Sequence, residues 1–150
     1  MSKSNTFENE FLAMVFNNAN ISLIGDATGL RGSAAAGSLF LALHTADPGE
    51  AGDQTTNEVT TAAYGQYARQ AVARSAAGFT VSGNQVTLTA AANWPQMTSG
   101  AGGAVATHFS IGVAVSGASK IHYRGPITPT IPINNGVTPQ LTTGTTITED

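Results

Sequence analysis

Three histidines are the side chains of this sequence with the widest chemical range. His44, His108 and His122 are candidate general bases, but the hydrolase form of serine catalysis places its nucleophile in a G-x-S-x-G turn, which is absent. The histidines also lack the short H-x-x-x-H spacing of zinc enzymes, and the chain has no cysteine. We therefore expect no enzyme and no cofactor, although a triad assembled from distant segments stays open.

Acidic residues form a local cluster at Asp47, Glu50, Asp53 and Glu58. Carboxylates are ligands that calcium prefers, but the alternating D-x-D-x-D-G loop is missing. A glycosidase pair would need a cleft, for which the spacing gives no evidence. We expect a hydrophilic surface excursion over residues 50–61 and no metal site, and we keep the four carboxylates as candidate contacts with a basic patch on a partner.

Charge is scarce along the whole chain. Only 10% of the 150 residues are charged, and six Lys and Arg against nine Asp and Glu give a net charge of −3, where a typical domain has about 25% charged residues. Phosphate backbones are bound by clustered cations, so we expect no nucleic-acid partner. No secretory signal and no apolar run near the roughly 20 residues of a bilayer span is present, so we expect no membrane partner.

The low charge has two readings. Uncharged, Thr-rich surfaces cost little to desolvate, which suits burial against neighbouring subunits. The alternative is a Thr-rich β protein with no special surface.

One helix is predicted near the start of the chain, with Asn5 as its N-cap and Glu8 three residues later. The spacing predicts an apolar face on this helix, made of Phe7, Phe11, Met14 and Val15. That face either docks on a partner or covers an open end of the chain's own core. Residues 25–37 are rich in Gly and Ala, and predict either a linker or a short second helix.

From residue 38 onward, short apolar runs are interrupted by turn residues every eight to twelve positions, which is typical of a sandwich or barrel. Seven or eight strands without intervening helices favour a mainly β fold, an antiparallel two-sheet sandwich with jelly-roll-like topology. We expect a single domain overall, with the helix and linker over 1–37 and the sandwich over 38–150. Four aromatic side chains should fill the space between the sheets: Phe40, Phe79, Trp94 and Phe109.

Particular strands follow from local signals. Pro and Gly in the turn Asp47-Pro48-Gly49 end a strand over 38–45. Residues 79–88 predict a hairpin, and prolines at 126, 129 and 132 place the strand over 127–133 at a sheet edge. A strand over 66–74 carries Arg69 and Arg74 on opposite faces. Each arginine is a candidate for a bidentate contact with a carboxylate across an interface, or for a pair within the chain.

Several short blocks resemble small virion proteins of tailed bacteriophages. They are LALHTADPG at 41–49, YAR at 67–69, VAR at 72–74 and HFSIG at 108–112. The resemblance runs in block order over residues 1–150, including the Thr-Glu-Asp ending. It is closest to the decoration, or cement, proteins of capsids, while similar sequences are also labelled tail or fibre proteins.

The resemblance implies a jelly-roll-like subunit, a homodimer, that is made in the host cytoplasm and lies on the capsid exterior of the virion. There it would bind the major capsid protein across capsomer boundaries and stabilise the shell by binding alone. A tail, tail-fibre or baseplate component is the alternative reading. A hydrolase or sugar-binding module is a weaker alternative of another class, since one Trp and three Tyr provide few aromatics for a sugar platform.

Overall fold

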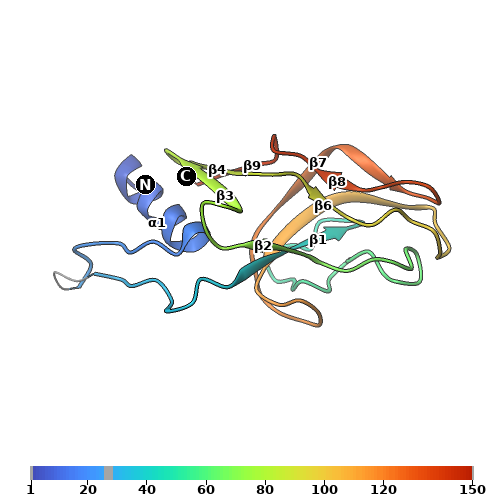
Figure 1. Cartoon of the computed structure of the whole chain (residues 1–150), viewed down its shortest axis with the longest axis horizontal. Coiled ribbons are helices and arrows are strands. Elements are labelled where there is room, and N and C mark those ends of the chain that lie inside the picture. The colour runs from blue at the N-terminus through green and yellow to red at the C-terminus, as the bar shows by residue number, and fades with distance from the viewer. Residues whose placement is uncertain (1, 26–28, 150) are drawn as a thin grey trace. The chain divides into compact units, whose positions relative to one another are not determined.

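The computed structural model describes residues 2–25 and 29–149 of the chain (Figure 1). These residues form two compact units. The helix unit contains the described residues of Met1–Ser38, Val72–Ala91 and Thr142–Asp150. The sandwich unit contains Leu39–Ala71 and Ala92–Leu141.

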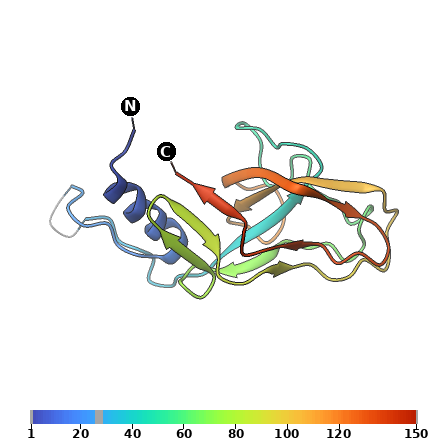
Figure 2. The ribbon, with the colours of Figure 1, turned by 90° about the horizontal axis from the view of Figure 1, so that it is seen from above.

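The helix unit consists of one helix packed on a small antiparallel sheet. The elements are α1 (Asn5–Asn17), β3 (Phe79–Ser82), β4 (Gln85–Leu88) and β9 (Thr146–Thr148), with sheet order β3-β4-β9. Figure 2 shows α1 lying against the β3–β4 hairpin, where the Phe16 and Phe79 rings meet edge to face with centroids 5.0 Å apart. The predicted hairpin is confirmed, and Gly83, with φ of 60°, occupies the first position of its two-residue turn.

The predicted helix is confirmed, but its cap and its buried face differ from the prediction. Ser4 is the N-cap, and its hydroxyl accepts from the Phe7 amide at 3.4 Å. The buried residues are Glu8, Leu12 and Phe16, whereas Phe7, Phe11, Met14 and Val15 are only half-buried. Apolar residues occupy much of the helix circumference, so the spacing fits more than one face, and packing against the hairpin selects the row that includes Leu12 and Phe16.

The segment after α1 contains no helix in its described part. Ile21 and Leu30 pair across an isolated antiparallel bridge, with N–O distances of 2.9 and 2.8 Å. Residues 29–37 are irregular apart from this bridge, which favours the linker reading there. Residues 26–28, which the same prediction covers, lie outside the described residues.

The sandwich unit is formed mostly by antiparallel strands. A four-stranded sheet has the order β2-β1-β6-β7, and β5 pairs with β8. The strands are β1 (Ser38–His44), β2 (Gln70–Ala73), β5 (Ala92–Asn93), β6 (Ala104–Gly112), β7 (Ile121–Ile133) and β8 (Gln140–Leu141). The boundary between the units falls after the first residue of β1 and after Ala71 within β2. In the register of β1 and β6, Leu41 lies opposite Ile111 and Leu43 opposite Phe109, so buried apolar residues meet across the ladder.

The mainly β, antiparallel, sandwich-like class is confirmed. In the described residues the sheets have four, three and two strands, where a regular jelly roll has two sheets of four. The proline-bearing strand β7 lies at a sheet edge as predicted. The strand expected over 66–74 is shorter, since only Gln70–Ala73 pair.

The predicted aromatic core is divided between the two units. Trp94 and Phe109 are buried in the sandwich unit, while Phe79 is buried in the helix unit against Phe16. Phe40 is half-buried. No helix among the described residues is long and apolar enough to span a membrane.

Candidate functional site

The candidate site is an exposed loop that follows β6, residues 113–119, which we call the valine loop. Val113 is 41% exposed and Val115 is 63% exposed. The loop has the sequence VAVSGAS and carries no charged side chain. Its conformation depends on polar side chains from two other segments of the sandwich unit.

Arg69 is the first of these supports. Its Nε and Nη2 donate to the two carboxylate oxygens of Glu58, each at 2.8 Å. The same guanidinium donates to the Ala114 carbonyl at 3.0 Å and to the Gly117 carbonyl at 2.9 Å. The Arg69 side chain is 2% exposed and that of Glu58 14% exposed, so this ion pair is largely desolvated and ties the loop to the acidic segment.

Tyr67 completes the ion-pair cluster. Its hydroxyl donates to Glu58 Oε1 at 2.9 Å and accepts from the Leu43 amide at 3.0 Å. Burial, followed by the charge of Glu58, raises the pKa of Tyr67 far above its ordinary value, so the hydroxyl keeps its proton and remains a donor. The hydrogen bonds to Glu58 raise the pKa of Arg69, although burial acts against them.

Gln54 is the second support of the valine loop. Its side chain is fully buried, and its Oε1 accepts from the Ala114 amide at 3.0 Å. The Gln54 amide donates to the Ser119 carbonyl at 2.9 Å. Gly112 makes room for this side chain, since a Cβ at that position would lie 2.1 Å from the Gln54 carboxamide carbon. Both ends of the loop are therefore fixed by the segment that the sequence predicted to be a surface excursion.

That prediction was wrong for part of residues 50–61, because Gln54 and Val59 are buried. The four acidic residues are also dispersed. Asp47 pairs with Arg124, and Asp53 accepts from the amide and hydroxyl of Thr55 at 2.7 and 2.6 Å. Among the described residues, no group of three or more His, Cys, Asp or Glu side chains is placed to hold a metal.

Hydrogen bonds lower the pKa of two carboxylates, those of Asp47 and Asp53. The Gly49 amide, and then the Arg124 guanidinium, lower the pKa of Asp47. The Thr55 hydroxyl and amide lower the pKa of Asp53. Both side chains therefore stay ionised well into the acid range, and each one fixes the turn in which it lies.

His44 and Ser110 form a buried pair that has the elements of a hydrolase dyad. His44 Nε2 lies 2.8 Å from Ser110 Oγ, and its Nδ1 lies 2.8 Å from the Thr56 carbonyl. Since a carbonyl only accepts, Nδ1 carries the proton and Nε2 accepts from the serine. Both side chains are fully buried, and burial lowers the pKa of His44. The pair therefore connects β1, β6 and the acidic segment, and in this arrangement neither group contacts solvent.

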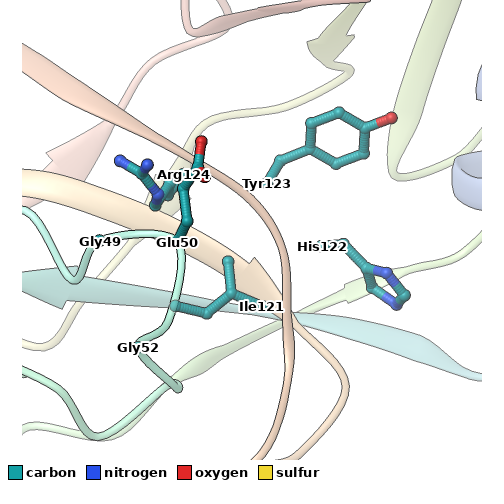
Figure 3. A pocket seen from close by; sticks show the side chains of 7 residues that line it. All are labelled: Gly49, Glu50, Gly52, Ile121, His122, Tyr123 and Arg124. Atoms are coloured by element: carbon teal, nitrogen blue, oxygen red, sulfur yellow. The ribbon is translucent and has the colours of Figure 1, made fainter.

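A cavity of about 400 Å³ lies between the turn at residues 49–52 and the start of β7 (Figure 3). The residues that line it are Gly49, Glu50, Gly52, Ile121, His122, Tyr123 and Arg124. Arg124 Nη1 donates to both carboxylate oxygens of Asp47, at 2.5 and 2.6 Å. Glu50 is the one member of the acidic cluster that lines this cavity.

Arg74 belongs to the helix unit and is used within it. Its Nε donates to the Val15 carbonyl at 2.7 Å, and its Nη1 donates to Asn18 Oδ1 at 2.8 Å. It therefore satisfies carbonyl groups at the C-terminus of α1, where a cation is also favoured by the helix dipole. Both predicted arginines thus have partners within the chain, and contacts of the ten candidate residues with other proteins stay predictions.

Sequence reasoning missed Val113, Val115 and Gln54.

The sequence did contain one signal for the partner of Arg69, because residues 59–148 contain no Asp or Glu. Any carboxylate partner for Arg69 therefore had to come from Glu58 or from another distant position. The same absence means that the valine loop and the strands beside it have no negative charge of their own.

Comparison with known proteins identifies a family. The family described as "Podophage GP4 fiber I protein gp80" matches residues 2–149. No curated protein matches the chain. A match over nearly the whole length includes both units, so neither unit is an addition to the family's common sequence. The chain therefore belongs to this family of fibre-related bacteriophage structural proteins, and its place is in the virion.

Proposed function

We propose that this protein is a structural subunit of the phage tail-fibre apparatus, which acts by binding neighbouring subunits and performs no reaction. The observation that carries this proposal is the match of residues 2–149 to a fibre family. Capsid decoration, which the resemblance of the short blocks favoured, is the second candidate, and both share the coarser role of a virion structural protein.

Physical features of the chain support adhesion as its activity. Only 10% of its residues are charged, so most of its polar side chains are Thr, Ser, Asn and Gln, which cost less to desolvate than charged side chains. The His44–Ser110 pair is buried and contributes to internal packing. When a subunit has two binding sites, its first contact raises the effective concentration for the second. Two contacts of modest area can therefore give stable attachment.

The partners follow from this role. We propose contacts with other structural proteins of the particle and with a second copy of the chain, and none with nucleic acid or membrane. On the capsid reading, the partner would be the major capsid protein, and binding only to the intact shell would stabilise that shell by mass action.

Copy number and location test the proposal. Quantitative mass spectrometry of purified particles gives the copy number relative to the major capsid protein, and antibody-gold labelling in electron micrographs gives the location. A fibre subunit is expected in few copies and at one vertex. Copies near the number of capsid subunits, spread over the shell, would replace the fibre proposal by decoration, and absence from the particle would overturn both.

A further inference from the structure

The valine loop exposes apolar surface on a fixed backbone. Val113 and Val115 are 41% and 63% exposed, and valine is among the residues most often fully buried. Single exposed apolar residues are ordinary on protein surfaces. The loop differs because two such residues lie two positions apart in a segment without charge, supported by buried polar groups.

The polar side chains that hold the valine loop, Arg69 and Gln54, fix its backbone, although burying their polar groups costs free energy. Arg69 is buried and Glu58 is largely so, and an ion pair in such a place is often no more stabilising than apolar residues of the same volume. Its geometric effect is specific, because Arg69 holds the Ala114 and Gly117 carbonyls while Gln54 holds the Ala114 amide. The loop is therefore ordered when the protein folds, so a partner that binds it does not have to order it.

The available groups define the chemistry of the partner. Several backbone groups of the loop already bond inward, so the surface that remains is made mainly of Val, Ala and Ser side chains. Lys120 follows directly, is exposed and forms no ion pair with the described residues. One lysine is too few for a nucleic-acid site. The surface complementary to the valine loop and Lys120 is instead an apolar patch on a protein, with a carboxylate at its edge to pair with the lysine.

We propose that the valine loop binds a different structural protein of the phage particle, through an apolar patch on that protein with a carboxylate at its rim facing Lys120. The identity of the partner as a particle subunit rests on the proposed function. The loop itself is argued from exposure, support and charge.

The test is incorporation of full-length variants into particles. Phage carrying Val113→Asp together with Val115→Asp are purified, and the copy number of the protein is measured by quantitative mass spectrometry. Placing two carboxylates at an apolar contact is expected to reduce incorporation about tenfold or more, as for central interface residues. The matched control is Val105→Asp, at a valine in β6 that is also 41% exposed, and it should incorporate like the wild type.

A second pair of variants tests the charge. Lys120→Glu is expected to lower incorporation by a smaller factor than the double valine variant, and Lys120→Arg should retain it, because rim charges contribute less than buried anchors. Far-UV circular dichroism and the fluorescence of Trp94 confirm that each variant is folded. If the aspartate pair disturbs folding, Val113→Ser with Val115→Ser replaces it.

Each outcome decides the matter. Normal incorporation of the folded valine variants, or an equal loss with Val105→Asp, would overturn the proposal. If the purified wild-type protein self-associates and the valine variants are monomeric, the occupant is a second copy and the proposed partner is wrong. If the wild-type protein is found on the shell and not at the tail, the proposed fibre function is wrong. The incorporation of the valine variants then still tests whether the valine loop is a binding surface.

Discussion

Removing the negative charge beneath the valine loop should destabilise the sandwich unit strongly. Glu58→Gln keeps the size of the side chain but leaves the guanidinium of Arg69, whose side chain is 2% exposed, without its carboxylate. Breaking a buried ion pair by removing one partner typically costs about 3–5 kcal/mol. The two carbonyls bound to Arg69 remain, so we expect the lower end, about 3 kcal/mol.

Urea unfolding followed by the fluorescence of Trp94 measures this effect. Trp94 is the single tryptophan and is buried in the sandwich unit, so it reports on the unit that contains the ion pair. With a urea m value of about 2 kcal/mol per molar, a loss of about 3 kcal/mol lowers the midpoint by about 1.5 M.

The matched control is Asp47→Asn, which removes the carboxylate from the more exposed pair with Arg124. Its effect should be clearly smaller, since exposed pairs contribute little. A second comparison is Glu58→Gln combined with Arg69→Met, which removes both charges and should recover part of the lost stability. Equal midpoints for Glu58→Gln and Asp47→Asn would refute the reasoning.

Three further predictions concern other positions. Burial lowers the pKa of His44 below its ordinary value of 6.5. Below about pH 6.5 the unfolded chain therefore binds a proton at this histidine that the folded chain does not bind, and the free energy of unfolding should fall as the pH drops. His44→Asn should flatten this dependence between about pH 7 and 5, as measured by urea titrations. Arg74→Met should cost about 2 kcal/mol by leaving helix carbonyls without a charged donor, and should speed amide hydrogen exchange in α1. Gly112→Ala should cost roughly 1–3 kcal/mol by crowding Gln54, measured by the same urea assay.

Each of these predictions has its own control. An unchanged pH dependence in His44→Asn would show that other groups cause it. For Arg74→Met, hydrogen exchange in β6 should stay as in the wild type, and a general increase would contradict a local effect on the helix. Gly125→Ala, in the same unit, is the control for Gly112→Ala, because its Cβ would meet its nearest neighbour, the Phe109 ring, at 3.4 Å, so equal losses of stability in the two variants would argue against crowding by Gln54.

Several elements could be predicted because their signals are local. The hairpin around Gly83, the helix over 5–17 and the proline-bearing edge strand each depend on residues within a few positions of one another. The face of α1 could not be predicted in this way. Six of its thirteen residues are Phe, Leu, Met or Val, so the periodicity leaves several faces open, and contact with β3 and β4 selects one.

The candidate site shows the same limit. Asp47, Glu50, Asp53 and Glu58 are close in sequence, which suggested one cluster, yet Asp47 and Glu58 pair with Arg124 and Arg69, respectively 77 and 11 positions away. The valine loop gave no motif, because exposure of Val113 and Val115 depends on what packs around them. Composition could indicate a structural protein of low charge, but it could not show which apolar side chains stay exposed.

By itself, the sequence determined the mainly β class, the helix near the start of the chain, several turn positions and the scarcity of charge, since each follows from residue type and short-range spacing. Only the tertiary structure decided the strand order, the division into two units and the pairing of Arg69 with Glu58 beneath the valine loop. Long-range pairing is set by the competition among many burial and hydrogen-bonding choices across the chain. No local pattern records which of these choices has the lowest free energy.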